Sequence, residues 1–422
     1  MGECVCSAIP LKFSPSKPPA AKYHEQISCR KMRVHIGVCG IGLGHVSRTV
    51  LVARELLARG HKLSFSAYGQ AVEYLIKHGF NPVVVASVGY GVGWDGGISV
   101  KQTIKENLLL PVKLALQTAA ETACINDRDA DFVLSDTRAS TVLAAKALGR
   151  PVATILNQYN LLLKTNRYRW LAEMTQHAIQ APTLVWDMSD LIVVPDLPPP
   201  LTISEATLNI PEEQKSKTVF VGPLVERLSF SKGEVDKIRG EYDAEDRPLV
   251  LIVVSGGPFE KKVLVERFLS MADILSDGYS YVLTSANPSS SEMRKIGSLR
   301  VYDWIEDLNK LIMAADLVVG RGGLTLISKC IAYGKKMLLI PTPQHGEQLS
   351  NSRKAAKIGV ARVVEQNSLD PAMFERAVKL ALNDEDMDEC VRVLKNVAEK
   401  CGGASTVAEL VEKQAKNVSQ KN

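Results

Sequence analysis

The sequence has no run of about 18 apolar residues, so we expect no transmembrane helix. Its eight cysteines include no CxxC pair and no His cluster accompanies them, which argues against a zinc site. Their scatter over apolar positions indicates a reducing compartment, so we expect a cytoplasmic protein. The net charge is only +5 and the basic residues form no block with interleaved aromatics, which argues against a nucleic-acid partner.

The first 31 residues also lack hydrophobic periodicity. They are rich in Pro, Ser and Lys, and they contain no apolar segment of the kind that a secretory signal needs. The start does not fit the myristoylation pattern, because Cys6 stands where that pattern has Ser or Thr. We predict a disordered tail over residues 1–31 and regard Met32 as a candidate start of the protein.

From residue 33 onward, strand and helix patterns alternate, which is typical of an α/β protein with parallel sheets. An apolar strand, a glycine turn and a helix open each half of the chain. We therefore predict two Rossmann-like domains that face a cleft, over residues 32–220 and 221–385, and C-terminal helices over residues 386–422. Finer expectations are a domain connection within 196–246, a glycine-rich loop over 88–98, a helix over 161–181, and a helix over 99–125 kinked by Pro111.

A strand, a glycine turn and a helix over residues 319–334 form the most informative pattern. Backbone N–H groups of the Gly322-Gly323 turn, at a helix N-terminus, favour an anion. A polar loop follows the next strand, and both loops lie at carboxyl ends of strands, where parallel sheets bind ligands. A nucleotide sugar presents a phosphate beside hydroxyl groups, so the pattern predicts a nucleotide-sugar site. The Gly256-Gly257 turn offers further phosphate contacts, and Arg321 either meets a phosphate or is solvated.

The glycine turn after the first strand carries His45 where a dinucleotide-binding fingerprint has its third glycine, so we reject that interpretation. His45 suits a general base in the cleft, and its alternative role is to bond the start of a helix. Asp136 ends another strand, where it either orients His45, acts as the base, or caps a helix. Asn157 and Gln158 end the next strand and suit sugar hydroxyls.

Together these motifs resemble the GT-B glycosyltransferases of family 28, in the branch of the bacterial lipid II N-acetylglucosaminyl transferase and its archaeal-type homologues. Gly42-x-Gly44-His45-x-x-Arg48 is similar to the N-terminal loop of that family. Tyr302-x-Trp304-Ile305 resembles the approach to the donor site, and the stretch from Gly323-x-Thr325 to Glu347-Gln348 resembles the nucleotide-sugar motif. The resemblance spans residues 32–385.

The resemblance implies an inverting hexosyltransferase that needs neither a metal nor another cofactor. It would move a hexose or N-acetylhexosamine from a nucleotide diphosphate sugar, expected to be a UDP-sugar, to a hydroxyl of a small-molecule, glycan or lipid-linked acceptor. The N-terminal domain then binds the acceptor and the C-terminal domain the nucleotide sugar. The implied roles are catalysis by His45 and Asp136; donor phosphate binding by Gly256, Gly257, Arg321, Gly322, Gly323, Leu324 and Thr325; nucleoside binding by Trp304, Ile305, Ser328 and Lys329; donor-sugar binding by Gln344, Glu347 and Gln348; and acceptor contacts by Gly44, Arg48, Asn157 and Gln158.

Lys329 departs from the family pattern, which has a ribose-binding Glu at this place. A lysine side chain has hydrogen-bond donors and no acceptor, so we expect either that Lys329 binds a phosphate or that Ser328 binds the ribose. Apolar residues 108–112, near Lys101, Lys105 and Lys113, are consistent with a lipid-linked acceptor at the inner membrane surface, or with an ordinary buried helix. Two rival functions stay open, a non-catalytic nucleotide-sugar binder and a GT-B nucleotide-sugar epimerase, which would need several carboxylates in the cleft.

Overall fold

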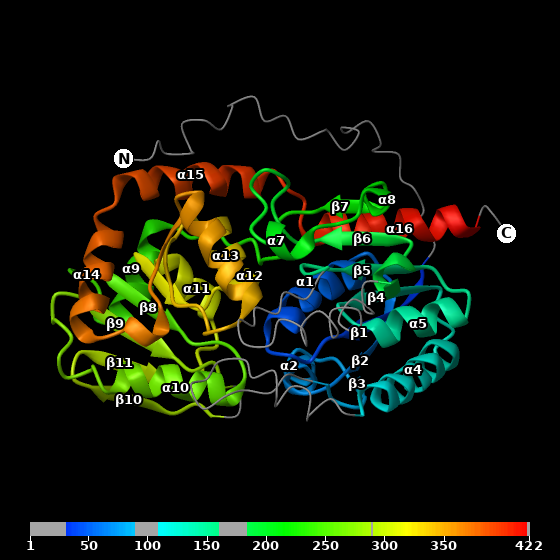
Figure 1. The fold of residues 1–422 in the computed structure, drawn as a ribbon, viewed down its shortest axis with the longest axis horizontal. Helices are drawn as coiled ribbons and strands as arrows, with labels where there is room; N and C mark the ends of the chain where they lie inside the picture. The colour runs from blue at the N-terminus through cyan, green and yellow to red at the C-terminus, as the bar shows by residue number, and fades with distance from the viewer. Residues whose placement is uncertain (1–30, 89–108, 160–183, 288–289, 420–422) are drawn as a thin grey trace, which may run out of the picture.

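The computed structural model describes residues 31–88, 109–159, 184–287 and 290–419. These residues form two α/β domains that lie side by side (Figure 1). The expected tail over 1–31 falls, except for Lys31, outside the described residues, as does most of the glycine-rich loop and all of the expected helix over 161–181. The prediction of two Rossmann-like domains is confirmed.

The N-terminal domain is built on a seven-stranded parallel sheet in the order β3-β2-β1-β4-β5-β6-β7. Its central strands β1, β4, β5 and β6 are mostly apolar and buried on both faces, as the strands of parallel sheets usually are. The strands are β1 Arg33–Val38, β2 Lys62–Ala67, β3 Pro82–Val84, β4 Phe132–Asp136, β5 Val152–Ile155, β6 Leu191–Val194 and β7 Thr218–Phe220. The helices are α1 Gly44–Ala58, α2 Gln70–Lys77, α4 Leu110–Asp127, α5 Ala139–Ala147, α7 Glu205–Leu208 and α8 Glu212–Lys215.

The C-terminal domain repeats this plan with the order β10-β11-β9-β8-β12-β13-β14, in which only the edge strand β10 is antiparallel to its neighbour. The strands are β8 Leu249–Val253, β9 Ser280–Thr284, β10 Met293–Ile296, β11 Leu299–Tyr302, β12 Leu317–Gly320, β13 Lys336–Leu339 and β14 Ala361–Val363. The helices are α9 Lys232–Glu241, α10 Pro258–Leu269, α11 Leu308–Ala314, α12 Leu324–Tyr333, α13 Gly346–Lys357, the 3₁₀ turn η2 Gln366–Ser368, and α14 Pro371–Leu382.

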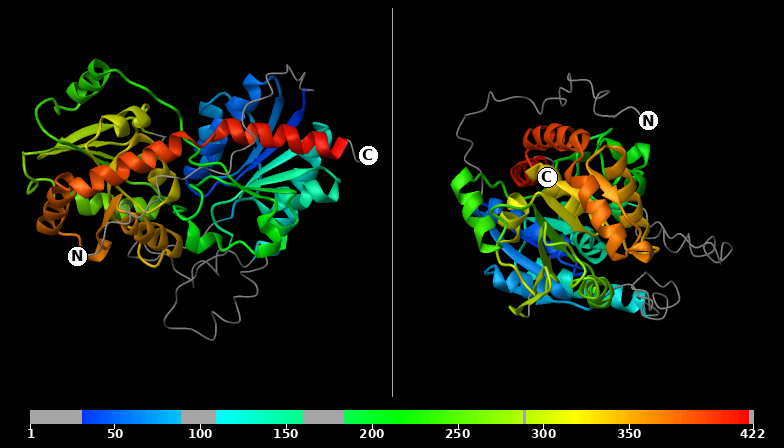
Figure 2. Two further views of the ribbon diagram at one scale, coloured as in Figure 1. Left: turned by 90° about the horizontal axis from the view of Figure 1, so that it is seen from above. Right: turned by 90° about the vertical axis from the view of Figure 1, so that its left-hand side faces the viewer.

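The last two helices join the domains. Helix α15 (Glu385–Glu399) packs on the C-terminal domain, and α16 (Ala404–Ser419) runs back over the N-terminal one (Figures 1 and 2). Val407, Ala408 and Val411 of α16 lie in the same apolar cluster as β1 and α1. The chain thus crosses between the domains twice, which ties them together.

Helix α4 begins at Leu110, and residues 99–108 of the expected kinked helix lie outside the described residues. Pro111 lies in the first turn of α4, where proline is tolerated because its missing N–H would have no partner. The region 196–246, within which we expect the domain connection, contains strand β7 and the three helices α7, α8 and α9. These elements are too short or too polar to show the periodicity from which the other elements are predicted. No helix among the described residues is long and apolar enough to cross a membrane.

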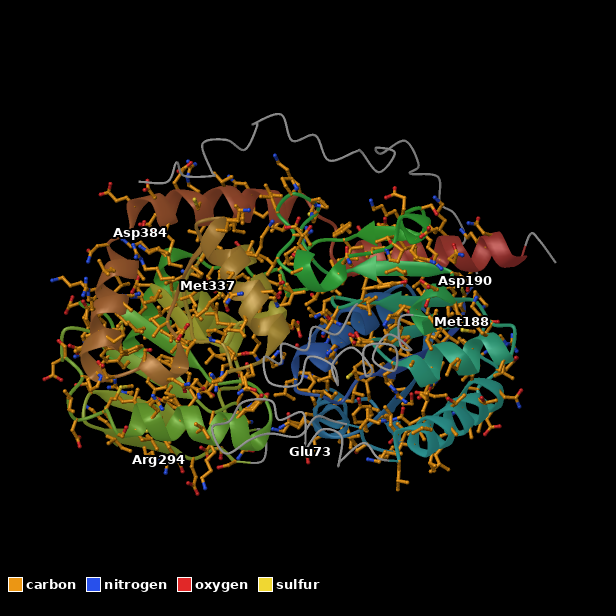
Figure 3. All side chains as sticks on the ribbon, in the orientation of Figure 1. Glu73, Met188, Asp190, Arg294, Met337 and Asp384 are labelled. Carbon is orange, nitrogen blue, oxygen red and sulfur yellow. The ribbon has the colours of Figure 1, made fainter. Side chains whose placement is uncertain are left out.

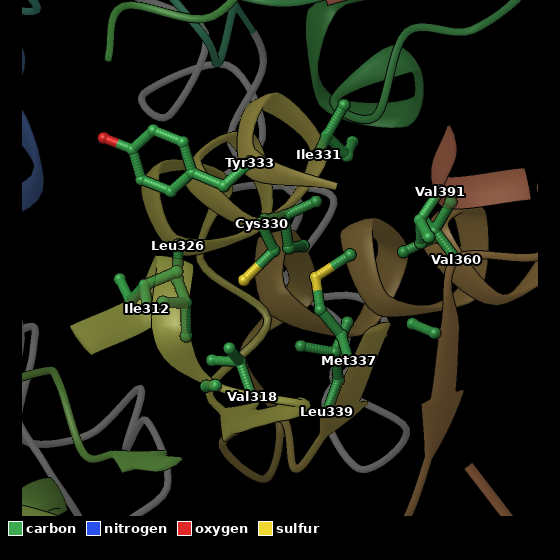
Figure 4. Close-up of a cluster of buried hydrophobic side chains, with 14 of the residues drawn as sticks. Ile312, Val318, Leu326, Cys330, Ile331, Tyr333, Met337, Leu339, Val360 and Val391 are labelled. Atoms are coloured by element: carbon green, nitrogen blue, oxygen red, sulfur yellow. The ribbon is translucent and has the colours of Figure 1, made fainter. Parts of the chain in front are cut away.

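Side chains follow the division between surface and core that the strand patterns predict (Figure 3). Glu73 and Arg294 are exposed on the two domains, whereas Met337 is fully buried inside the C-terminal one. Around Met337, residues of α12, β12 and β13 fill the space between helix and sheet (Figure 4). This packing fixes helix α12, whose N-terminus lines a cavity between the domains.

Candidate functional site

A cavity of about 1100 Å³ lies between the two domains. In each sheet the strand order reverses at one point, between β1 and β4 in the N-terminal domain and between β8 and β12 in the C-terminal domain. Loops that follow strands at such switch points diverge and leave a crevice for ligands. The loops after β1, β8 and β12 line this cavity, so the two crevices form one site.

His45 enters the cavity from the first turn of α1 and is held by the buried carboxylate of Asp136, at the end of β4. His45 Nδ1 lies 2.9 Å from Asp136 Oδ1. Arg48 Nε donates to Asp136 Oδ2 at 2.8 Å, and Thr49 Oγ1 donates to the same oxygen at 2.7 Å. Arg48 also donates to Asn157 Oδ1 at 3.0 Å, so one guanidinium joins the ends of β4 and β5.

The charge of Asp136 decides which nitrogen of His45 carries the proton. Burial alone would raise the pKa of Asp136, but the charge of Arg48 and the hydrogen bonds from Arg48 and His45 hold it well below the ordinary value. An ionised carboxylate only accepts hydrogen bonds, so in a neutral imidazole Nδ1 of His45 donates to Asp136. Arg48 Nη2 lies 3.0 Å from the same nitrogen and donates to Asp136 Oδ1 at 2.5 Å. Nε2 then keeps its lone pair, and no described residue bonds it. This is the arrangement of an oriented general base.

Across the cavity, the N-terminus of α12 offers an anion site. Gly323 occupies its N-cap position without a side-chain cap, and the first turn holds no acidic residue. The backbone N–H groups at this end and the helix dipole favour a negative group. Gly323, Leu324 and Thr325 all line the cavity, whereas Gly322 does not, because its Cα packs against α13. A Cβ on Gly44 would lie 2.7 Å from Thr325 Oγ1, so the starts of α1 and α12 nearly touch.

The turn before α10 is less suited to a phosphate than the sequence predicts. Gly257 N–H donates to Glu260 Oε2 at 2.7 Å, so the helix caps itself with its own carboxylate. Gly257 does not line the cavity, although Gly256 does. Glu260 stands three residues after the N-cap Gly257, which is the position of the acidic residue in a capping box.

Arg321, for which the sequence predicts a phosphate contact, is 1% exposed and does not line the cavity. Its guanidinium donates to the carbonyls of Ile340 and Glu260 and to Gln366 Oε1. The side chain of Arg321, directly before the glycine turn, points into the interface between sheet and helices. It therefore stabilises the two glycine turns on the side away from the cavity.

Lys261 supplies the positive charge that Arg321 does not. It lines the cavity beside Gly256 while being only 9% exposed. Its Nζ donates to the carbonyl of Ala286 at 3.0 Å, and no described carboxylate lies within ion-pair distance. Burial lowers the pKa of Lys261, which the charge of Asp303 opposes. Nothing in the sequence separates Lys261 from Lys262, so this residue could not have been predicted.

The polar loop after β13 meets the acceptor side of the cavity. Gln344, Glu347 and Gln348 all line it, and Gln344 has the positive φ of 62° that non-glycine residues rarely adopt. Asn157 Nδ2 donates to Glu347 Oε1 at 2.9 Å, a direct bond between the two domains. Gln348 is less available than expected, because its Oε1 accepts from the N–H of Thr342 at 2.9 Å.

Three of the four residues expected to bind the nucleoside line the cavity, and one does not. Trp304, Ile305 and Lys329 line the cavity. The Trp304 ring is covered on one face by Lys77 of the N-terminal domain, with Nζ 4.9 Å from the ring centre. Ser328 is buried and does not line the cavity, so the expectation that it takes a ribose does not fit its position.

The acceptor side contains the other expected residues. Gly44, Arg48, Asn157 and Gln158 all line the cavity, and Asp136 acts on it through His45. The described residues contain no cluster of three or more His, Cys, Asp or Glu side chains that could hold a metal ion.

Comparison with protein families gives two matches. A model described as "Glycosyltransferase family 28 C-terminal domain" matches residues 251–395, and one described as "Glycosyl transferase family 1" matches residues 32–234. The two matches meet near the start of β8, and together they cover both domains described above.

Relatives of similar length occur in archaea. A glycosyltransferase of Methanosarcina acetivorans is 28% identical over 395 residues, which cover 91% of this chain and 98% of the relative. A UDP-N-acetylglucosamine–N-acetylmuramyl-(pentapeptide) pyrophosphoryl-undecaprenol N-acetylglucosamine transferase of Sulfurihydrogenibium is 22% identical, over 44% of this chain and 51% of the relative.

Solved structures share the fold. The calicheamicin glycosyltransferase CalG4 superposes with a TM-score of 0.64 at 17% identity, covering 92% of this chain and 99% of that one. MurG of Acinetobacter baumannii gives a TM-score of 0.54 at 17% identity, covering 90% and 99%.

Proposed function

Since the chain is a glycosyltransferase of the GT-B fold with a C-terminal domain of family 28, we propose that it transfers a hexose or N-acetylhexosamine from a UDP-sugar to an acceptor hydroxyl, with inversion. The observation that carries this proposal is the His45–Asp136 pair facing the uncapped N-terminus of α12 across one cavity. A UDP-sugar as donor is supported by the name of the Sulfurihydrogenibium relative, which is a transferase that uses UDP-N-acetylglucosamine.

In the proposed reaction, Nε2 of His45 takes the proton of the acceptor hydroxyl. The acceptor oxygen forms a bond to the anomeric carbon as the bond from that carbon to the diphosphate oxygen breaks, and the electron pair leaves with the diphosphate. One base opposite one anion site supports a single displacement, which inverts the anomeric carbon. Asp136 stabilises the imidazolium that forms, and a positioned base of this kind typically contributes about 10²–10⁴-fold in rate.

The leaving diphosphate gains negative charge as its bond breaks. The N-terminus of α12 and the ammonium of Lys261 would stabilise that charge without a divalent ion. We therefore expect turnover to persist in excess EDTA, measured as release of nucleoside diphosphate. Loss of turnover in EDTA that Mg²⁺ restores would contradict a metal-independent reaction.

We also propose that the acceptor is lipid-linked and that the protein binds it at a membrane surface. On α4, beside Lys113, four apolar side chains are exposed, namely Leu109, Leu110, Val112 and Leu116. Leu110 also lines the cavity, so this apolar surface reaches the acceptor side of the site. Lys101 and Lys105 lie outside the described residues. Co-sedimentation with anionic vesicles that Leu116→Asp abolishes would support this proposal, and unchanged co-sedimentation would oppose it.

The test of the catalytic proposal is His45→Ala. We expect kcat to fall about 10²–10⁴-fold, because the acceptor proton loses its base, while the affinity for the donor stays within about twofold. Turnover is measured as nucleoside diphosphate release from a panel of UDP-sugars with glycoside and lipid-phosphate acceptors, and affinity by calorimetry. His78→Ala is the matched control, because His78 lines the same cavity away from Asp136. Equal kcat in the two variants would refute the role of His45.

A further inference from the structure

Among the charged side chains that line the cavity and have no role in the proposed mechanism, Glu226 and Lys329 lie beyond the α12 N-terminus. Glu226 comes from the segment between β7 and α9, and Lys329 from the second turn of α12. Asn309 of α11 lies beside them and also lines the cavity. Three elements distant in the sequence thus converge on one end of the site.

The packing of α12 decides that Lys329 faces this end. Leu326, Cys330 and Tyr333 are buried in the core of the C-terminal domain (Figure 4). Thr325 and Lys329, four residues apart on the neighbouring side of the helix, line the cavity. At a rise of 1.5 Å per residue, Lys329 lies roughly 7 Å along the axis from the helix N-terminus. A diphosphate bound at that N-terminus would therefore place the ring of an attached ribose near Lys329.

Glu226 is held in place but keeps acceptor capacity. Asn309 Nδ2 donates to its Oε2 at 3.1 Å, and its backbone carbonyl accepts from the hydroxyl of Tyr333 at 2.9 Å. A carboxylate accepts about four hydrogen bonds, and the described structure shows one side-chain bond to this carboxylate. Among the described residues no Lys or Arg pairs with it within 4 Å and no hydrogen bond to Oε1 is present, so this cavity-lining carboxylate keeps an acceptor oxygen.

The chemistry of this pair matches a vicinal diol. Two hydroxyls on adjacent carbons can each donate to one oxygen of a carboxylate, whereas Lys329 can only donate. A carboxylate close to a diphosphate would repel it, and the neighbouring ammonium offsets that repulsion. Burial lowers the pKa of Lys329, and the charge of Glu226 opposes that change, which places the two groups within electrostatic reach.

We propose that Glu226 binds the 2′- and 3′-hydroxyls of the donor's ribose, with Lys329 as its neighbouring positive charge. The inference rests on the proposed function, because it requires the diphosphate at the N-terminus of α12. It makes Glu226 a specificity residue that separates ribonucleotide from deoxyribonucleotide donors.

The test compares the binding of UDP and 2′-deoxy-UDP by calorimetry to the wild type and to Glu226→Gln, with the adenosine and guanosine pairs in parallel. We expect the wild type to prefer the ribonucleotide about 10- to 100-fold, as the loss of a hydrogen bond to a charged group predicts. Glu226→Gln keeps one oxygen for Asn309 but loses the charge and the second acceptor. The variant should lower this preference to within about threefold, mainly because it binds the ribonucleotide more weakly.

Glu213→Gln is the matched control, because Glu213 is exposed on α8, outside the cavity. It should bind both nucleotides as the wild type does. An unchanged ribonucleotide preference in Glu226→Gln, with thermal unfolding like that of the wild type, overturns the assignment of Glu226 and leaves the donor site intact. Failure of every nucleoside diphosphate to bind the wild type overturns the donor site and this inference with it.

Discussion

At the scale of single residues, the ability of the site to bind an anion depends on which cations face the cavity without a carboxylate partner. Arg321 is fully buried and bonded to carbonyls, whereas Lys261 has one carbonyl partner and faces the cavity. A buried ammonium without a counter-ion is costly, and an anionic ligand reduces that cost. Lys261 is therefore the side chain most directly matched to a diphosphate.

Replacing Lys261 by Met should weaken the binding of a nucleoside diphosphate about 10- to 100-fold, because a charge-assisted bond to the diphosphate is lost. The fold should persist, since an apolar side chain of similar length replaces a buried charge. The measurement is calorimetric titration with UDP. Lys262→Met is the control, because the Lys262 side chain is 67% exposed and pairs only with Glu266 at 3.8 Å. Equal losses in the two variants would refute a specific role for Lys261.

At the scale of elements, the conformation of the segment between β6 and α7 depends on the hydrogen bonds of one buried carboxylate. Asp196 is 1% exposed, and its Oδ2 accepts from both N–H and Oγ of Ser204, at 2.8 and 2.7 Å. Burial raises the pKa of Asp196 to about 6, although the bonds from Ser204 lower it. This segment leads to α7, which packs against α13 of the donor domain, so its stability affects the cleft.

The raised pKa of Asp196 has a definite sign in stability. The folded state binds the proton more tightly than the unfolded state, so the contribution is complete below about pH 4 and is lost as the pH rises through about 6. The loss is on the order of 2–3 kcal/mol. Urea unfolding of the wild type and Asp196→Asn between pH 4 and 7 should show the wild-type advantage shrinking as the pH rises. Asp136, whose pKa is lowered, gives an opposite pH trend in both proteins, so that trend cancels when the two unfolding free energies are subtracted. A difference in unfolding free energy that stays constant with pH would contradict the assignment to Asp196.

At the scale of the whole molecule, function depends on how closely the two domains approach. Asn157 bonds Glu347 at 2.9 Å, and Lys354 pairs with Glu205 at 2.5 Å. Gly44 leaves no room for a side chain against Thr325. These contacts place His45 opposite the α12 N-terminus, so the proposed catalytic geometry belongs to neither domain alone.

The variant Gly44→Ala tests this approach of the domains. The added Cβ would lie 2.7 Å from Thr325 Oγ1, so the domains must separate slightly, and we expect kcat/KM to fall about 100-fold. Unfolding should change little, because Gly44 has no positive φ and starts a helix. Gly233→Ala is the control, since a Cβ at Gly233 meets nothing within 4 Å. Wild-type turnover in Gly44→Ala would show that the close approach is not required.

The sequence by itself determined the two parallel-sheet domains, because apolar strands alternating with amphipathic helices admit few other folds. It also determined that the turns after β1 and β12, with His45 and Gly323, lie at the site, since carboxyl ends of strands at switch points line a crevice. The role of Lys329 was left open between alternatives, because its neighbours come from other elements.

Only the tertiary structure decided which polar side chains reach the cavity. Arg321 and Ser328 lie next to the glycine turn and in the helix that follows it, yet both point into protein, whereas Lys261 and Glu226 lie far away in sequence and reach the ligand space. Helical phase and side-chain packing set these directions, and both depend on contacts that are distant along the chain. The bond from Asn157 to Glu347 likewise exists only once the two domains are packed together.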